Sequence, residues 1–162
     1  MLDLAIENSG MDRIDAAILR TLSANARTST AEIARTVGLS APTVGERIRR
    51  LEEAGVIEGY AARINPKALG LPLSAWLRIR PLPGELKRVA DIVASLPEIV
   101  ECDRITGDDC FLARAHVASV GELERLIDRI IPHAMTNTAI IQSSPVAPRL
   151  PGVLAQKDRQ KG

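Results

Sequence analysis

The chain has 162 residues, of which 46% are apolar, so it can form one ordinary domain or two small ones and is unsuited to wholesale disorder. Its 21 Lys and Arg residues against 20 Asp and Glu residues leave a net charge of +1, so any basic surface must be local. Aromatic residues make up only 2%, which disfavours a binder of single-stranded nucleic acid that stacks bases on aromatic side chains.

The first predicted helix follows Asp12, whose carboxylate can cap it, with Asp15 three positions further on. After this cap, apolar residues recur at helical spacing and define one buried face: Ile14, Ile18, Leu19 and Leu22. The segment from Asn25 to Thr28 interrupts this helical spacing, so the helix is expected to end before it.

A second, shorter helix begins at a predicted capping box, in which Ser29 and Glu32 satisfy each other's first-turn groups. Gly38 stands where a helix end needs a residue with positive φ. Only Leu39 separates that glycine from Ser40, the expected cap of the next helix. The pattern therefore predicts two short helices joined by a tight turn.

The third predicted helix runs from about Ala41 to Ala54 and ends at Gly55; an extended stretch is expected from Val56 to about Ile64. Val44, Ile48 and Leu51 form its apolar side. The opposite side carries Pro42, Thr43, Glu46, Arg49 and Arg50, with Arg47 on the flank.

Two short helices joined by a glycine turn are typical of the helix-turn-helix, whose second helix places its N-terminal residues on base edges in the major groove. Three arginines close together on that helix suit phosphate contacts. The alternative is an ordinary three-helix domain with a solvated basic face. We expect a DNA interface made of Ser29, Thr30, Ser40, Ala41, Pro42, Thr43, Glu46, Arg47, Arg49 and Arg50.

The second half of the chain alternates strands and helices after a capped turn at Asn65–Gly70. The order β-α-β-β-α-β predicts a ferredoxin-like sandwich with an open sheet face and free edges. The expected strands are 73–79, 99–106, 111–117 and 136–142, the expected helices are 84–96 and 120–131, and a turn is expected at 107–109.

The first half of the sequence resembles the leucine-responsive regulator/asparagine-operon regulator family (Lrp/AsnC, the feast/famine regulators). The similarity is long and specific, and extends over roughly residues 11–144. It is carried by Met11-Asp12-Arg13-Ile14-Asp15, Ile18-Leu19, Val37-Gly38-Leu39-Ser40, the run from Glu46 to Ile57, Gly59-Tyr60 and Asn65-Pro66.

The resemblance implies an α+β transcription regulator: an N-terminal winged-type helix-turn-helix domain plus a C-terminal βαββαβ ferredoxin-like domain. Its expected partners are double-stranded DNA and further copies of itself, as a homodimer and a higher oligomer. The expected divisions are a DNA-binding domain at 11–60, a linker at 61–72, a sensing and oligomerisation domain at 73–144 and a flexible tail at 145–162, whose net charge is +3 (4 − 1).

In that family a small effector, commonly an amino acid, binds near the glycine-containing hairpin and the last strand. The resemblance transfers this role to Gly107, Asp108, Asp109, Cys110, Thr136, Thr138 and Ile140. Cys110 stands where the family has a carboxylate, and Pro132-His133-Ala134 replaces its Pro-Gly-Val. A thiol is a poor partner for an ammonium group, so amino-acid binding is expected to be weak unless Asp109 turns toward the pocket.

Other chemistry finds little support in the residues. His116 and His133 lack zinc-ligand spacing, and Cys102 and Cys110 are expected to be ordinary thiols, with a redox pair as the alternative. We expect no metal, no cofactor and no catalytic residue. The first ten residues do not resemble a signal peptide and no run is long enough to span a membrane, so a cytoplasmic protein is expected.

Two alternative functions stay open at this point. The first is an enzyme like the siroheme decarboxylases, which resemble the same family in both halves. The second is a protein that has lost its effector and only organises DNA.

Overall fold

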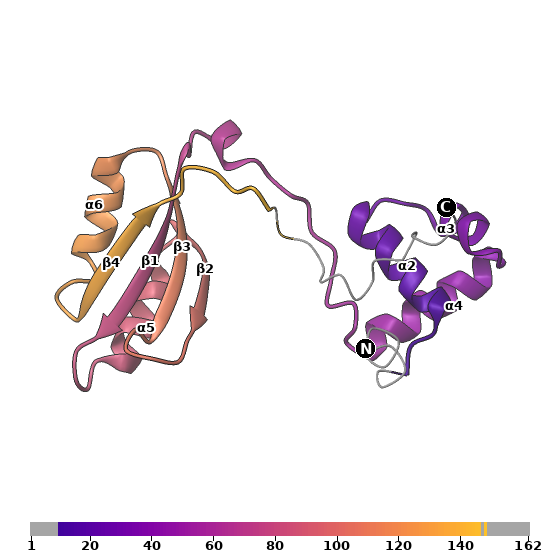
Figure 1. The fold of residues 1–162 in the computed structure, drawn as a ribbon, viewed down its shortest axis with the longest axis horizontal. Coiled ribbons are helices and arrows are strands. Elements are labelled where there is room, and N and C mark those ends of the chain that lie inside the picture. The colour runs from indigo at the N-terminus through magenta and orange to yellow at the C-terminus, as the bar shows by residue number, and fades with distance from the viewer. Residues whose placement is uncertain (1–9, 147, 149–162) are drawn as a thin grey trace, which may run out of the picture. The chain divides into compact units, whose positions relative to one another are not determined.

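The computed structural model describes residues 10–146 and residue 148. The chain divides into two compact units between Arg63 and Ile64, within the linker predicted at 61–72. The first unit is helical, and the second, Ile64–Pro145, combines a sheet with helices (Figure 1). The fold is therefore α+β, as predicted.

The described residues of the first unit form three helices, and each begins where the sequence predicts. They are α2 (Arg13–Ala24), α3 (Thr30–Val37) and α4 (Ala41–Glu53). Asp12, Ser29 and Ser40 are their N-caps, and the first two form complete capping boxes. The apolar sides of the three helices share one core, built on Ile18, Leu19, Ile33, Ala34, Val44 and Leu51.

The turn between α3 and α4 depends on Gly38. Its φ of 74° lies in the left-handed region that side-chain-bearing residues avoid, and its N–H donates to the carbonyl of Ala34 at 2.9 Å. Leu39 then leads directly to the Ser40 cap. This tight turn brings α4 against α3 as in a helix-turn-helix.

The expected extended stretch after α4 takes a different form. Gly55 adopts a φ of 68°, its N–H donates to Glu52, and the N–H of Val56 donates to Leu51, which is the Schellman pattern of a helix end. All residues from 54 to 72 are described, and none belongs to a strand. The described residues of this stretch therefore do not form the strand of a wing, which would need a neighbouring strand to complete a ladder.

The second unit begins with a short 3₁₀-helix, Pro66–Leu69, capped by Asn65. Its four strands form one antiparallel sheet in the order β2-β3-β1-β4, which is the predicted ferredoxin-like topology. The elements are β1 (Leu73–Pro81), α5 (Leu86–Ser95), β2 (Ile99–Arg104), β3 (Phe111–Val117), α6 (Val120–Asp128) and β4 (Ala134–Ile140).

Alternation along β1 and β3 separates a covered sheet face from an open one. Both α5 and α6 pack on the covered face of the sheet (Figure 1). The apolar core between them and the sheet includes Leu77, Ile79 and Phe111. The open face carries Trp76, with the guanidinium of Arg114 5.7 Å from its ring centroid. A face with these side chains and no helix over it is a candidate contact surface.

Several element ends differ from the prediction by one to three residues, and the structure shows the cause at two of them. Helix α6 ends at Asp128 rather than near residue 131, because tighter turns follow in which the N–H of Ile130 donates to Ile127 at 2.8 Å. Strand β4 begins two residues earlier than expected, at Ala134, because the pairing with β1 places Ala134 opposite Pro81. Register, which is a long-range property, sets the end of this strand.

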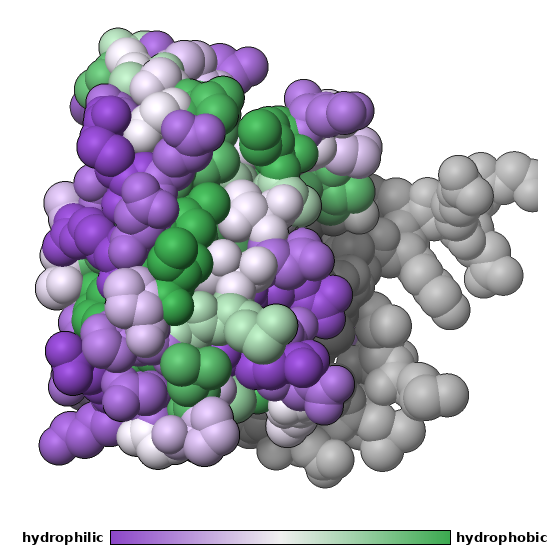
Figure 2. Space-filling model, turned by 90° about the vertical axis from the view of Figure 1, so that its left-hand side faces the viewer, coloured by the Kyte–Doolittle hydropathy of each residue, from purple (hydrophilic) through white to green (hydrophobic). Residues whose placement is uncertain are grey.

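The side of the second unit that carries α6 and β4 has an interrupted strip of apolar surface (Figure 2). Large apolar side chains are exposed on these two elements and their connection: Val120, Ile131, Met135 and Ile140. Strand β4 is also an edge of the sheet, so backbone groups are free beside this strip.

The predictions of no signal peptide and of a flexible basic tail concern residues 1–9, 147 and 149–162, which lie outside the described residues. Within residues 10–146 and 148, the helices are too short or too polar to cross a bilayer. In the same part of the chain, no three side chains of His, Cys, Asp or Glu gather closely enough to hold a metal ion.

Candidate DNA interface and effector pocket

One side of α4 faces solvent and carries most of the residues predicted to meet DNA. Pro42, Thr43, Glu46, Arg49 and Arg50 are all exposed, whereas Val44 and Leu51 on the other side are buried. Thr43, Glu46 and Arg50 follow one another at helical spacing along this side. The arrangement offers polar groups near the start of the helix and a cation one to two turns later.

The polar groups at the start of α4 form hydrogen bonds with one another. The hydroxyls of Ser40 and Thr43 are 2.7 Å apart, and the Ser40 oxygen accepts from the N–H of Thr43 at 3.3 Å. Ala41 is half-buried beside them. The main role of Ser40 is therefore to cap α4. The exposed hydroxyl of Thr43 is held in position by its contact with the Ser40 hydroxyl.

Ser29 and Thr30 lie at the start of α3. The Glu32 carboxylate accepts from both the N–H of Ser29, at 2.8 Å, and its hydroxyl, at 2.7 Å. Hydrogen bonds from Ser29 lower the pKa of Glu32, so this carboxylate stays ionised at the helix start. Thr30 is half-buried near Gly45 of α4. Both residues thus have structural roles in addition to any contact with DNA.

Arg49 is bound by two carboxylates of its own helix. Its guanidinium donates to Glu46 through Nε at 3.0 Å and through Nη2 at 2.5 Å, and it also contacts Glu53. The hydrogen bond from Arg49 holds the pKa of Glu46 below its ordinary value. Glu46 is therefore a fixed acceptor on the exposed side of α4, while the charge of Arg49 is largely balanced.

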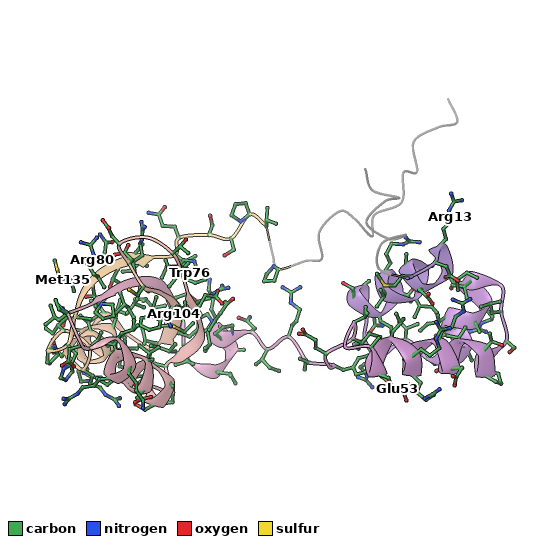
Figure 3. The ribbon with its side chains drawn as sticks, turned by 90° about the horizontal axis from the view of Figure 1, so that it is seen from below. Arg13, Glu53, Trp76, Arg80, Arg104 and Met135 are labelled. Atoms are coloured by element: carbon green, nitrogen blue, oxygen red, sulfur yellow. The ribbon has the colours of Figure 1, made fainter. Side chains whose placement is uncertain are left out.

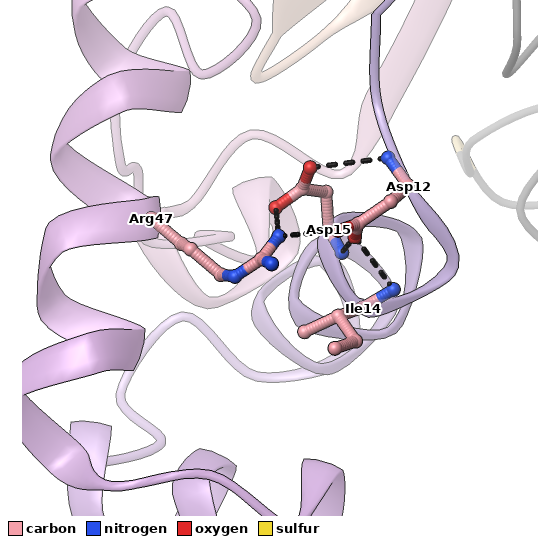
Figure 4. A network of polar contacts seen from close by, with 4 residues as sticks. All are labelled: Asp12, Ile14, Asp15 and Arg47. Atoms are coloured by element: carbon pink, nitrogen blue, oxygen red, sulfur yellow. Dashed lines mark hydrogen bonds and ion pairs between the residues drawn. The ribbon is translucent and has the colours of Figure 1, made fainter.

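Arg47 occupies a different environment from the other arginines of α4. Its Nη1 donates to Asp12 and to Asp15, each at 2.7 Å, and its side chain is only 21% exposed (Figure 4). Asp15 is 8% exposed and also accepts from the N–H of Asp12 at 3.1 Å. We call these three side chains the Asp12–Asp15–Arg47 clamp; it connects the start of α2 to the middle of α4.

Electrostatics stabilise the clamp. The hydrogen bonds to Asp15 and Asp12 raise the pKa of Arg47. Burial alone would raise the pKa of Asp12, but hydrogen bonds from the N–H of Asp15 and from Arg47 outweigh it and lower this pKa. Stability from Asp12 is therefore present above its ordinary pKa and is lost as the pH falls through the lowered value. In this position Arg47 binds protein carboxylates, and the phosphate contact expected for it stays a prediction.

Arg50 is the arginine of α4 that has no ion pair with a described residue. It is exposed, and it lies on the same side of the helix as Thr43 and Glu46. An exposed guanidinium without an internal partner can bind a phosphate at no cost in broken ion pairs. Among the three arginines of α4, Arg50 is thus the one best suited to contact the DNA backbone.

The second unit contains a pocket of about 520 Å³ at one end of its sheet. The hairpin between β2 and β3 forms one wall, β1 forms the base, and the start of β4 forms the other wall. Arg80 and Met135 lie together at this end of the sheet, away from Trp76 (Figure 3). The lining residues are Arg78, Arg80, Ile105, Thr106, Gly107, Asp108, Asp109, Met135, Thr136 and Asn137.

Two arginines and two aspartates balance each other in this pocket. Arg78 Nε lies 2.9 Å from Asp109 Oδ2, and Arg80 lies 3.1 Å from Asp108 and 3.7 Å from Asp109. Asp109 is 20% exposed, whereas Asp108 is 87% exposed at the tip of the hairpin. The pocket therefore offers anionic and cationic groups side by side, with Asp109 as its deeper carboxylate.

The predicted effector residues separate into two groups. Gly107, Asp108, Asp109 and Thr136 line the pocket, but Cys110, Thr138 and Ile140 do not. Cys110 is half-buried against the apolar core, and its N–H donates to the carbonyl of Ile79 at 3.0 Å. Register places Thr138 opposite Leu77 and Ile140 opposite Ala75, both core residues on the covered face of the sheet.

The two cysteines are free thiols. Cys102 pairs with Ala113 in the sheet, while Cys110 precedes Phe111, which pairs with Arg104. The two are therefore separated along the β2–β3 ladder. Burial, and then the neighbouring Asp103, raise the pKa of the Cys102 thiol, which disfavours the reactive thiolate.

Both units match known domain families. Residues 11–52 match the AsnC-type helix-turn-helix domain, and residues 74–150 match the Lrp/AsnC ligand binding domain. The chain belongs to the Lrp/AsnC family. Together the two matches contain most of α4 and the whole pocket of the second unit.

Individual members of the Lrp/AsnC family are similar over most of their length. The HTH-type transcriptional regulator LrpA of Mycobacterium tuberculosis is 38% identical over 132 residues, which cover 81% of this chain and 88% of that protein. The solved structure of Bacillus subtilis LrpC has a TM-score of 0.81 at 33% identity, covering 85% of this chain and 99% of that one. A Neisseria meningitidis transcriptional regulator in complex with L-methionine has a TM-score of 0.81 at 26% identity, covering 88% and 97%.

These Lrp/AsnC relatives are transcriptional regulators and not enzymes, so the decarboxylase alternative is set aside. Sequence reasoning missed Arg78, Arg80 and Asn137 as pocket residues. Arg78 lies in the strand predicted at 73–79 and Arg80 lies just after it. In a strand that continues to Arg80, the two side chains point to the same side of the sheet, and this spacing could have indicated the pocket. It also missed that Asp15 lies on the apolar side of α2, where a carboxylate requires a partner.

Replacing Arg50 with Ala is expected to weaken binding to every DNA sequence, because one phosphate contact is lost. The slope of log affinity against log salt concentration should become shallower by about 0.9. Filter binding or fluorescence anisotropy over a salt series measures this slope. Arg125→Ala in α6, which removes an equally exposed charge from the other unit, is the control; equal slopes for wild type and Arg50→Ala would exclude Arg50 from the interface.

Proposed function

We propose that this regulator reads double-stranded DNA with the exposed side of α4 and that a zwitterionic small molecule controls it from the pocket of the second unit. The single observation that carries the first part is the exposed row of Thr43, Glu46 and Arg50 on the second helix of a helix-turn-helix. The protein acts in the cytoplasm, where chromosomal DNA is accessible to a regulator of this kind.

In this proposal the residues of α4 divide into base-reading and phosphate-binding groups. The Glu46 carboxylate can accept from the exocyclic amino group of cytosine, and the Thr43 hydroxyl can donate or accept at a base edge. Pro42 lies beside them, where its ring can contact a thymine methyl group. Arg50 binds phosphate and fixes the register of the helix on the duplex.

The effector part of the proposal rests on the alternating charges in the pocket. An α-amino acid carries an ammonium and a carboxylate a few ångströms apart, so it can bind Asp109 with one and Arg78 with the other. Ile105 and Met135 offer apolar surface for its side chain. The complexes of two relatives with L-methionine show that family members bind such a molecule.

Self-association is the third part of the proposal. The open sheet face presents Trp76 between Arg114 of β3 and Ala139 of β4, with no helix of its own unit over it. A second copy that contributes the same face would bury Trp76 and make an isologous dimer. The exposed apolar strip on α6 and β4 offers a second surface for larger assemblies.

Thr43→Val and Glu46→Gln are expected to change sequence preference rather than fold. A lost base contact should reduce the ratio of operator affinity to random-DNA affinity about 5- to 150-fold. Genome-wide mapping of bound DNA supplies the operator, and gel shifts on operator and random duplexes measure the ratio. Glu124→Gln in α6 is the control, and parallel losses on both duplexes would contradict the assignment.

Asp109→Asn is expected to weaken amino-acid binding about ten- to a hundredfold, because the ammonium loses a charge-assisted hydrogen bond. Cys110→Ser should leave the affinity unchanged, since Cys110 faces the core and not the pocket. Calorimetric titration with each of the twenty amino acids, L-methionine first, tests both variants. A wild type that binds none of them would favour the alternative of a DNA-organising protein without an effector.

Trp76→Glu is expected to convert a dimer into a monomer of 17.4 kDa, because the new charge would be desolvated at the centre of the shared face. Light scattering at micromolar concentration measures the mass. Lys87→Glu on the exposed side of α5 should leave the assembly intact. A wild type of monomer mass under these conditions would overturn the proposed self-association.

A further inference from the structure

We infer that the Asp12–Asp15–Arg47 clamp is a positioning device for DNA binding, which fixes how α4 is presented and keeps Arg47 away from the phosphates. The inference rests on the proposed reading of DNA by α4 and assigns a role to residues outside the reading side. Asp12 caps α2 and Asp15 lies in its first turn, 35 and 32 residues before Arg47 in the sequence. They would influence DNA affinity without touching DNA.

The clamp lies at the junction between α2 and α4. Helix α4 is joined to α3 by the tight Gly38 turn and packs more closely on α3 than on α2. An open pocket of about 330 Å³, lined also by Arg50, lies beside Asp15 and Arg47. Two short hydrogen bonds from one guanidinium nitrogen therefore supply the tie between α2 and α4 there (Figure 4).

If Arg47 left the clamp to bind a phosphate, the carboxylates of Asp12 and Asp15 would lose their cation. Arg47 would give up both of its bonds at 2.7 Å and leave the Asp15 carboxylate, 8% exposed, without a cation. A phosphate contact would have to compensate for that buried, unpaired charge. Arg50 is exposed and has no ion pair with a described residue, so it can make the same contact without this loss. The two arginines therefore have different roles: Arg47 positions α4, and Arg50 binds the phosphate backbone of the DNA.

If the clamp positions α4, removing a carboxylate charge from it should change DNA affinity in the direction opposite to the one that simple electrostatics predicts. Asp12 and Asp15 place negative charge on a domain that binds a polyanion, so removing either charge would by itself tighten DNA binding. If the clamp orients α4, Asp15→Asn instead weakens operator binding, because the reading side no longer fits the groove. The number of phosphate contacts stays the same, and so does the salt slope.

The experiment compares full-length Asp15→Asn, Asp12→Asn and Arg47→Lys with wild type, on operator and random duplexes over a salt series. Asp15→Asn and Arg47→Lys should each lower operator affinity about tenfold, with less effect on random DNA and with unchanged salt slopes. Asp12→Asn, at the more exposed carboxylate, should show the same changes to a smaller degree. Asp128→Asn in α6 is the control and should bind as wild type does.

Binding is measured well below the melting temperature of each variant, with circular dichroism confirming the helices, so that loss of fold does not count as loss of positioning. Asp12→Asn keeps the test valid if Asp15→Asn fails to fold, because Asp12 is 51% exposed. Asp15→Asn combined with Arg47→Gln replaces the ion pair with a neutral hydrogen bond and should recover part of the operator preference.

The inference is overturned if Asp15→Asn or Asp12→Asn tightens DNA binding and steepens the salt slope by about one, since Arg47 would then be free to bind phosphate. It is also overturned if folded variants keep the wild-type ratio of operator to random affinity. Failure of the proposed function looks different: in that case the wild type itself would show no operator preference.

Discussion

A nearly buried carboxylate must have a cation, and this requirement at Asp15 determines much of the first unit. Asp15 lies on the inner side of α2, where little of its side chain is open to water, and Arg47 of α4 is the cation that reaches it. The pair removes one of three arginines from the surface of α4 and ties that helix to α2. What remains exposed is a short row of polar groups, followed by Arg50, which has no ion pair with a described residue.

Paired charges also organise the second unit, with a different result. In the sheet order, β1 lies between the β2–β3 hairpin and β4, so Arg78 and Arg80 of β1 can reach the hairpin aspartates. Here the ion pairs lie at an open pocket and remain partly exposed. A ligand with one charge of each sign can insert among them, whereas nothing comparable is possible inside the Asp12–Asp15–Arg47 clamp.

Local chemistry made the helices and their ends predictable. Capping boxes at Asp12 and Ser29, the left-handed Gly38 and the alternation along β3 each depend on residues within a few positions of one another. The partner of Arg47 could not be predicted in the same way, because the contact joins residues 32 positions apart and Arg47 stands among other arginines.

The distinction between local and long-range contacts also explains the other differences between the predicted and the observed structure. The start of β4 depends on its register against β1, and whether the segment after α4 forms a strand depends on a partner strand from elsewhere. Cys110 was assigned to the pocket because it occupies the family's carboxylate position, yet the turn at Gly107 directs Asp109 there and Cys110 toward the core. Hairpin geometry, not sequence position alone, decides which side chain meets a ligand.

In the proposed complex Arg50 meets DNA while Arg47 stays bound to Asp12 and Asp15. Nuclear magnetic resonance spectra of the arginine side-chain N–H groups, recorded during titration with an operator duplex, distinguish the two arginines. We expect the Arg50 signal to shift and broaden, while the Arg47 signal keeps its position and its slow exchange with water. A shift of the Arg47 signal to that of a phosphate-bound guanidinium, with Arg50 unchanged, would contradict this expectation.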